Sequence, residues 1–313
     1  MSKPGDPSTI VVTGGNTGLG FESVRAAAAA GRFSDIVVAS RIAGRARSAI
    51  ASLAPQTSRL HAVPLNLASL SSVRQFPDAI AALDAPPIGA VLCNAGVQIV
   101  EESRFTVDGF EETFAVNVLG HFLLTKLLLP AMTPDARVIF VSSGTHDPTL
   151  KTGMPEPRYT SAADLAAGAG FEGMHTKKLG QIRYTTSKLC DVYLAYGFAR
   201  RYPKGNPDGP SLVVSAMDPG LMAGSGLARD YGPLSRFAWK HILPRARRFM
   251  KGAMTTEASG LNVARLATEP NFCEESGTYF IGVTRAPSSD LSYDQANAVD
   301  LWSTCATLAG VDQ

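Results

Sequence analysis

Short apolar runs alternate with longer stretches of helical periodicity along most of the chain. Seven runs are apolar or β-branched over most of their length, which is typical of strands buried on both faces. They are residues 9–13, 35–40, 60–65, 88–94, 136–143, 211–218 and 276–282. The first helical stretch, residues 18–30, is rich in alanine and stops at Gly31. The pattern predicts an α/β fold: a doubly wound parallel sheet of about seven strands with helices on both faces.

Two segments interrupt this alternation. Residues 144–180 are rich in Gly, Pro and Ala, and residues 221–252 carry many basic and aromatic side chains. Both follow the C-terminal ends of predicted strands, the edge where open α/β sheets bind ligands. We therefore expect 144–180 to be an insertion whose residues 155–175 cap a substrate cleft, with a passive surface excursion as the alternative, and 221–252 to be a substrate lid. No linker or repeat divides the chain, so we expect residues 1–313 to form one domain.

Composition narrows the class of protein. Hydrophobic residues make up 45% and charged residues 18%, and the net charge is +2, too small for the basic footprint of nucleic-acid binding. Cysteines stand at 93, 190, 273 and 305 without metal-ligand spacing, so reduced thiols and no metal are expected. The N-terminus lacks the layout of a signal peptide and no apolar run reaches membrane length. We expect a cytoplasmic protein that is not integral to a membrane.

A glycine-rich turn joins the first strand to the first helix. It reads TGGNTGLG over residues 13–20, and Gly14, Gly18 and Gly20 allow a tight turn and a close approach to a pyrophosphate. The following helix N-terminus offers N–H groups and a partial positive charge to an anion. This placement predicts a dinucleotide site in a Rossmann fold.

The end of the second strand indicates which dinucleotide is bound. Enzymes that use NAD usually place an acidic residue there for the ribose 2′-hydroxyl, whereas this chain has Ser40 and Arg41. A guanidinium favours the 2′-phosphate of NADP(H), and Arg45 could add a second cation. The alternative is that Arg41 is an ordinary surface arginine.

Tyr184 and Lys188 form a Y-x-x-x-K pair. The spacing i, i+4 puts both side chains on one face of a helix. An ammonium beside a phenol favours the phenolate and lowers the pKa of the tyrosine, which suits acid–base chemistry near neutral pH. By itself the pair is a common coincidence, but an upstream strand that ends in Ser142-Ser143 and the glycine turn add weight to it.

Together these motifs resemble the short-chain dehydrogenase/reductase family over roughly residues 8–285. The resemblance implies an Asn-Ser-Tyr-Lys site of Asn117, Ser143, Tyr184 and Lys188. Tyr184 would be the general acid in reduction, and Ser143 would bind the same oxygen; it is preferred to Ser142 because the family serine is usually the second of the pair. Lys188 would lower the tyrosine pKa and contact the nicotinamide ribose. Asn117 would hold a proton-relay water.

The same resemblance implies the cofactor contacts. They are Gly14, Asn16, Thr17, Gly18, Leu19, Gly20, Ser40, Arg41, Asn66, Leu67, Asn94, Ala95, Gly96, Tyr184, Lys188, Pro219, Gly220 and Ser225. Two positions depart from the family pattern. Asn66 stands where the family usually has Asp, and Gly224 stands where it usually has the threonine that binds the carboxamide, so that Ser225 becomes the substitute.

Finer features resemble the branch that contains retinol dehydrogenases and protochlorophyllide reductases. They are the ASR at 39–41, the SKL at 187–189, NVLGHFLLT at 117–125 and PGLMAGSGLAR at 219–229. The long apolar coverings predict a bulky, largely apolar ketone or aldehyde as substrate. The basic segment 229–251 is expected to be a lid, with a solvated helix face, a membrane-surface helix or a clamp for an acidic substrate as alternatives. Family members are usually dimers or tetramers, which implies a homo-oligomer.

Three functions from different classes fit the sequence. The leading hypothesis is an NADP(H)-dependent carbonyl reductase or alcohol dehydrogenase that moves a hydride between nicotinamide and a small-molecule carbonyl or alcohol. The second is a non-catalytic NADP(H)-binding regulator, which would need the glycine turn and Arg41 but not Tyr184. The third is a nucleotide-sugar epimerase or dehydratase, which shares Y-x-x-x-K but usually has a G-x-x-G-x-x-G turn.

Overall fold

The computed structural model describes residues 6–54, 56–100, 102–171, 173–222 and 253–312. Most of the expected lid region 221–252 lies outside these ranges, and with it Gly224, Ser225 and the basic segment 229–251.

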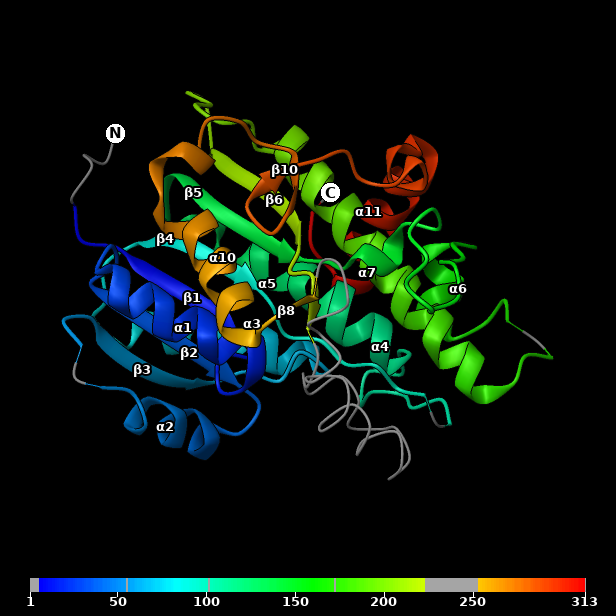
Figure 1. The fold of residues 1–313 in the computed structure, drawn as a ribbon, viewed down its shortest axis with the longest axis horizontal. Coiled ribbons are helices and arrows are strands. Elements are labelled where there is room, and N and C mark those ends of the chain that lie inside the picture. The colour runs from blue at the N-terminus through cyan, green and yellow to red at the C-terminus, as the bar shows by residue number, and fades with distance from the viewer. Residues whose placement is uncertain (1–5, 55, 101, 172, 223–252, 313) are drawn as a thin grey trace.

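The described part of the chain is built on one large sheet. Its strand order is β10-β9-β6-β5-β4-β1-β2-β3, and every neighbouring pair is parallel except β9–β10. The strands are β1 Thr9–Thr13, β2 Asp35–Ser40, β3 Arg59–Pro64, β4 Ile88–Cys93, β5 Met132–Val141, β6 Leu212–Asp218, β9 Thr278–Ile281 and β10 Thr284–Arg285. The chain order reverses between β1 and β4, so the predicted doubly wound α/β sheet is confirmed (Figure 1).

Alternate residues of each central strand feed two separate cores. In β1, Val11 packs into one core, whereas Ile10 and Val12 pack into the other. This follows from the two-residue period of a strand. Because β1 and β2 are buried along their whole length, both faces of the sheet must be covered by helices.

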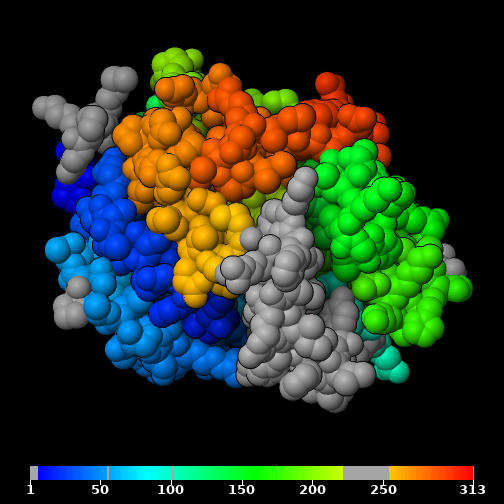
Figure 2. Space-filling view, viewed as in Figure 1, coloured from blue at the N-terminus to red at the C-terminus, as the bar shows by residue number. Residues whose placement is uncertain are grey.

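Helices α1 Gly18–Ala30 and α10 Thr256–Thr268 cover one face (Figure 1). They lie so close that a β-carbon added at Gly260 would stand 2.4 Å from Glu22 Cβ. Figure 2 shows the same two helices in contact on the surface. The opposite core takes side chains from α3 Leu70–Ala81, α5 Gly120–Leu128, α7 Thr176–Arg201 and α11 Gln295–Ala309. The short helix α2 Ala43–Ala51 follows β2.

The insertion between β5 and α7 is tied to two helices. It contains the short helix α6 Ala162–Ala167. The Asp300 carboxylate on α11 accepts hydrogen bonds from the Tyr159 hydroxyl at 2.7 Å and the Ala162 N–H at 2.8 Å. The Arg158 N–H donates to Thr186 Oγ1 on α7 at 2.8 Å. These contacts hold the N-terminal part of α6 and the residues before it against the body of the protein.

The sheet has one more strand than the sequence pattern predicts. Seven strands are parallel, as expected, and the eighth, β10, runs antiparallel to β9 at the edge. Gly282, with φ +59°, lies in the turn between them. Both residues of β10 are exposed, so no apolar run marks it in the sequence. Among the described residues, β7 Leu221–Met222 and β8 Ala253–Met254 form a separate parallel pair.

Candidate active site

The glycine turn packs against itself at the C-terminal end of β1. Gly14 has φ +66°, in the left-handed region that favours glycine. A β-carbon at Gly20 would lie 2.4 Å from Gly14 O, closer than any side chain tolerates. Thr17 precedes α1 without a side-chain cap, and the first turn of α1 holds no acidic residue. The first N–H groups of α1 are therefore not capped by Thr17 and suit an anionic ligand.

Residues that follow β4 brace this turn. The N–H groups of Asn94 and Ala95 each donate to Thr13 Oγ1 at 2.9 Å, and Asn94 Nδ2 donates to Thr13 O at 2.8 Å. A β-carbon at Gly14 would meet Ala95 Cα at 3.1 Å. The glycine turn at 13–20 and the residues that follow β4, although far apart in the sequence, are thus packed together.

The residues expected on the adenosine side lie at the ends of β2 and β3. Ser40 is buried and its hydroxyl donates to Ile42 O at 2.9 Å, which shapes the turn after β2. Arg41 and Arg45 are exposed. Asn66 Oδ1 accepts a hydrogen bond from the Ala68 N–H at 3.3 Å, so its side chain shapes the turn after β3, and the neighbouring Leu67 is buried.

Tyr184 and Lys188 lie on α7 and are each 5% exposed. Lys188 Nζ is 5.7 Å from the centroid of the Tyr184 ring and donates to Val141 O, at the end of β5, at 2.9 Å. A β-carbon at Gly96 would lie 3.8 Å from Lys188 Nζ. The lysine therefore adjoins both the tyrosine and Gly96, which follows the residues that brace the glycine turn.

The two serines after β5 have different surroundings. Ser142 is buried and its hydroxyl donates to Lys188 O at 2.7 Å, which fixes α7 to the strand. Ser143 Oγ accepts a hydrogen bond from the Thr145 N–H at 3.3 Å, so its own proton is not used in that contact. The Ser142 hydroxyl proton is thus used inside the protein, whereas the contact with Thr145 does not use that of Ser143.

Asn117 lies in a π-helical turn, Ala115–Leu119, between α4 Glu112–Phe114 and α5. Its Oδ1 accepts from the Val97 N–H at 2.8 Å, and its Nδ2 donates to Val97 O at 3.0 Å and to Ser187 Oγ at 2.9 Å. The side chain thus ties the segment after Gly96 to α7. π-Helical turns often occur at functional sites.

The ends of β5 and β6 also meet. A β-carbon at Gly144 would stand 2.9 Å from Asp218 Oδ2. Asp218 Oδ1 accepts from the Gly220 N–H at 2.9 Å, and Pro219 O accepts from the Ser259 hydroxyl at 2.7 Å. The structure thus gathers the expected residues at the C-terminal edge of the sheet, apart from Ser225, which lies outside the described residues.

Comparisons with known proteins agree with this geometry. Residues 8–161 match the family model described as short chain dehydrogenase. The chain is 31% identical to protochlorophyllide reductase B of Hordeum vulgare, over 96% of this chain and 78% of that protein. It is 30% identical to protochlorophyllide reductase B of Oryza sativa subsp. japonica, over 97% of this chain and 77% of that protein. The chain belongs to the short-chain dehydrogenase/reductase family.

Solved structures share the fold of this short-chain dehydrogenase/reductase. A putative uncharacterized protein from Mycobacterium paratuberculosis aligns with a TM-score of 0.69 and 25% identity, over 99% of this chain and 98% of that one. A blue fluorescent protein from a metagenomic library, solved with NADPH, aligns with a TM-score of 0.61 and 20% identity, over 89% and 97%. The two plant relatives are named as chloroplastic, and the cytoplasmic location expected from the sequence stays a prediction.

One described helical stretch of this dehydrogenase, Glu112–Ala131, has the length and apolar composition of a membrane span. Most of it is buried inside the protein, as in a core helix. Its burial is explained by packing against the sheet.

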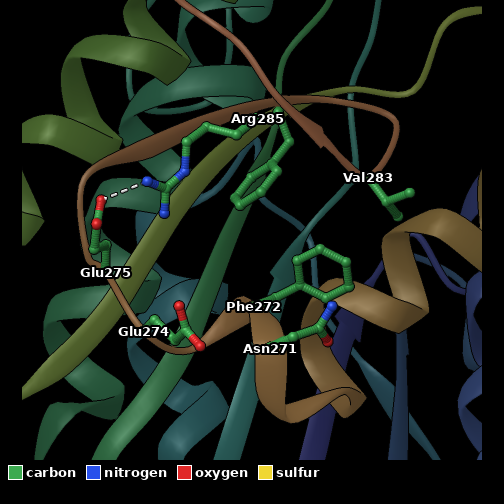
Figure 3. Close-up of a pocket in the computed structure, with 7 residues that line it drawn as sticks. Asn271, Phe272, Glu274, Glu275, Val283 and Arg285 are labelled. Carbon is green, nitrogen blue, oxygen red and sulfur yellow. Dashed lines mark ion pairs between the residues drawn. The ribbon is translucent and has the colours of Figure 1, made fainter.

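A hollow of about 160 Å³ lies at the β9–β10 edge (Figure 3). Among its lining residues, Glu275 and Arg285 point toward each other and form an exposed ion pair at 2.8 Å. The hollow is smaller than the roughly 300 Å³ at which small-molecule sites begin. No residue of the candidate site lines it, so we assign it no function.

His121 is a buried neighbour of the site that sequence reasoning did not single out. Its Nδ1 lies 3.0 Å from Asn117 O, and because a carbonyl only accepts, Nδ1 carries the proton. Its Nε2 lies 2.9 Å from Thr13 Oγ1, whose single proton is within reach of both this ring nitrogen and Leu92 O, at 3.1 Å. Burial lowers the pKa of His121 to about 4, with the Asn117 carbonyl opposing and the Lys188 charge assisting. The neutral ring links the glycine turn to the helix that carries Asn117.

This histidine should make the fold acid-sensitive. Its pKa in the folded state, about 4, lies below the ordinary 6.5, so the unfolded chain takes up the proton first. The contribution of the neutral His121 to the free energy of unfolding is intact above pH 6.5 and is lost as the pH falls toward 4. We expect His121 to account for about 2 kcal/mol of lost unfolding free energy between pH 7 and pH 5. Urea unfolding at both pH values measures it.

The matched variant is His121→Asn, whose amide keeps a donor for the Asn117 carbonyl. The pH dependence of its unfolding free energy should be shallower by that amount, although its stability at pH 7 is lower. An unchanged slope would show that another group, such as the buried His146, carries the acid sensitivity.

Proposed function

We propose that the chain is an NADP(H)-dependent carbonyl reductase or alcohol dehydrogenase that acts on a bulky, largely apolar ketone or aldehyde. One observation carries the proposal. The Tyr184 phenol and the Lys188 ammonium lie together on α7, and the ammonium stands beside Gly96, which follows the residues that brace the glycine turn. A group suited to acid–base chemistry thus lies next to a glycine turn of the kind that binds dinucleotides. The name protochlorophyllide reductase, shared by the relatives, supports reduction as the reaction class.

A nicotinamide dinucleotide fits the residues of this site. The close contacts at Gly14 and Gly20 hold the turn in a tight shape that a side chain at Gly20 would break, and the first turn of α1 offers N–H groups to an anion. Exposed Arg41 and Arg45 suit a 2′-phosphate. The residues proposed to hold the cofactor are Gly14, Asn16, Thr17, Gly18, Leu19, Gly20, Ser40, Arg41, Asn66, Leu67, Asn94, Ala95, Gly96, Tyr184, Lys188, Pro219, Gly220 and Ser225. When bound, NADPH supplies the hydride.

The remaining chemistry belongs to the chain itself. In reduction, the Tyr184 phenol gives its proton to the carbonyl oxygen of the substrate, and the Ser143 hydroxyl donates a hydrogen bond to that oxygen. The Lys188 ammonium stabilises the phenolate that remains. Asn117 binds Val97, which follows Gly96, and Ser187 on α7. It thereby holds the segment beside Lys188 against the helix that carries the lysine.

We further propose that residues 1–313 act as one dinucleotide-binding domain, with the 144–180 insertion over the substrate. The insertion is anchored through Tyr159 to Asp300 and through Arg158 to Thr186, two residues after Tyr184. Anchoring so near the phenol suits a cap better than a passive loop. Homo-oligomer formation stays a prediction from the family.

The choice of cofactor is tested by Arg41→Asp. A phosphate would then face a carboxylate, so we expect NADPH affinity to fall about 10- to 100-fold and NADH affinity to change by less than about threefold. Intrinsic protein fluorescence or calorimetric titration with each dinucleotide measures both constants. An equal loss for the two cofactors would refute the preference for NADP(H).

The reaction itself is tested by the consumption of NADPH in the presence of large apolar ketones and aldehydes. Turnover of at least one, with the matching alcohol as product, is expected. Tight NADPH binding with no turnover across the panel would instead favour a non-catalytic regulator.

A further inference from the structure

A buried carboxylate lies one helical turn after Lys188. Asp191 is 3% exposed, and its Oδ2 accepts a hydrogen bond from Lys188 Nζ at 2.9 Å. The ammonium donates a second hydrogen bond, to Val141 O, at 2.9 Å. Two of the three donors of Lys188 are thus used inside the protein, and one remains for a ligand or a water.

Burying two charges side by side is costly, and a pair far from solvent needs good geometry to persist. Here the carboxylate both cancels most of the lysine charge and fixes its direction. A neutral partner such as asparagine could fix the direction alone. The presence of a charged partner therefore bears on the electrostatics of the site.

We propose that Asp191 is a positioning residue that holds the Lys188 ammonium and keeps the Tyr184 phenol protonated to a higher pH than Lys188 alone would. The inference rests on the proposed function, in which Tyr184 gives its proton to the substrate. Asp191 would set the pH up to which Tyr184 keeps this proton.

The carboxylate is charged where phenols titrate. Burial raises the pKa of Asp191 to about 6, although the Lys188 charge and hydrogen bond oppose the rise. Burial also disfavours the charged lysine, but Asp191 and Tyr184 outweigh it and the pKa of Lys188 is raised. Above pH 6 the pair is therefore a buried ion pair, whose net field at Tyr184 is weaker than that of an isolated ammonium.

Three other titratable groups interact with the pair, namely Cys93 on β4, His121 on α5 and Cys190 on α7. Asp300 and Cys305 on α11 act on Cys190. Burial raises the pKa of each of the three thiols and lowers that of His121, so all four groups are neutral at pH 7. Asp300 acts on Cys190 and is hydrogen-bonded to Tyr159. Among the described residues, Asp191 is thus the carboxylate in contact with the lysine.

The test is Asp191→Asn, which keeps the shape of the side chain and an acceptor for Lys188. Tyrosines labelled with ¹³C at Cζ report their own ionisation by NMR, and the Tyr184 signal is identified by its loss in Tyr184→Phe. We expect the midpoint of Tyr184 to fall by about one pH unit in Asp191→Asn. The matched control is Asp300→Asn on the neighbouring helix, which should leave the midpoint in place. A Tyr184 midpoint that stays or rises in folded Asp191→Asn overturns the proposal.

A second measurement needs no variant and so does not depend on whether Asp191→Asn folds. Because Asp191 ionises at about pH 6, the Tyr184 signal of the wild-type protein should shift slightly near that pH, before its larger step at high pH. A flat signal through that range would contradict the coupling.

Kinetics separate this inference from the proposed function. With a carbonyl substrate and NADPH, the alkaline limb of kcat/KM should move to lower pH in Asp191→Asn by the same amount as the NMR midpoint. A wild-type protein that reduces no carbonyl would sink the proposed function, yet the NMR midpoints would still decide the role of Asp191. If the protein is active but Asp191→Asn changes neither the alkaline limb of kcat/KM nor the Tyr184 NMR midpoint, only the proposed role of Asp191 is refuted.

Discussion

Replacing Tyr184 with phenylalanine is expected to slow carbonyl reduction by about 10²- to 10⁴-fold, the usual worth of a positioned general acid. The ring is 5% exposed and packs beside Lys188, so removal of one hydroxyl should leave the fold unchanged. The loss should appear in kcat and in kcat/KM alike, because the proton is transferred in the transition state. NADPH affinity should change by less than about threefold. Steady-state kinetics and a cofactor titration measure the two effects.

The control is Tyr193→Phe on the same helix. The Tyr193 hydroxyl donates to Leu291 O at 2.7 Å, well inside the packing between α7 and the C-terminal segment. Its removal should cost roughly 1 kcal/mol of unfolding free energy and leave turnover within about twofold. Equal turnover in Tyr184→Phe and the wild-type protein would show that another group, or water, supplies the proton.

The sequence predicted the parts of the fold that local patterns specify. Helix α1 runs from Gly18 to Ala30, as expected, because the glycine turn begins it and Gly31, with φ +60°, ends it. The central strands were recognisable because both of their faces are buried and their runs are apolar throughout. Strand β10 was missed because its two residues are exposed and pair only through the turn at Gly282.

The candidate site was predicted by motif, but its supporting contacts were not. Lys188 and Asp191 stand at i, i+3, a spacing that on most helices marks a solvated salt bridge. Only the packing of α7 against the sheet buries the pair, and the local sequence pattern does not predict that packing. His121 is similar: it sits in a run of apolar residues and becomes a hydrogen-bonded link only when Thr13 and Asn117 are brought to it.

The glycine turn offers the second large effect, in Gly20→Ala. The added β-carbon would stand 2.4 Å from Gly14 O and 2.5 Å from Asn94 Nδ2, and the first of these is backbone that cannot rotate away. The turn must open, which should cost about 1–3 kcal/mol of unfolding free energy. Opening also displaces the N–H groups at the start of α1, so NADPH affinity should fall about tenfold or more. Thermal or urea unfolding and cofactor titration measure these losses.

Gly44→Ala is the matched control for that change. Gly44 lies in α2, close to Arg41 in the sequence, and a β-carbon there would meet only Arg47 Nη2, at 4.0 Å. Alanine favours a helix over glycine by up to about 1 kcal/mol, so this variant should be as stable as the wild-type protein or slightly more so. Its NADPH affinity should be unchanged. If Gly20→Ala behaved like Gly44→Ala, the close packing of the turn would not be what shapes the dinucleotide site, and cofactor binding would have to depend on residues elsewhere.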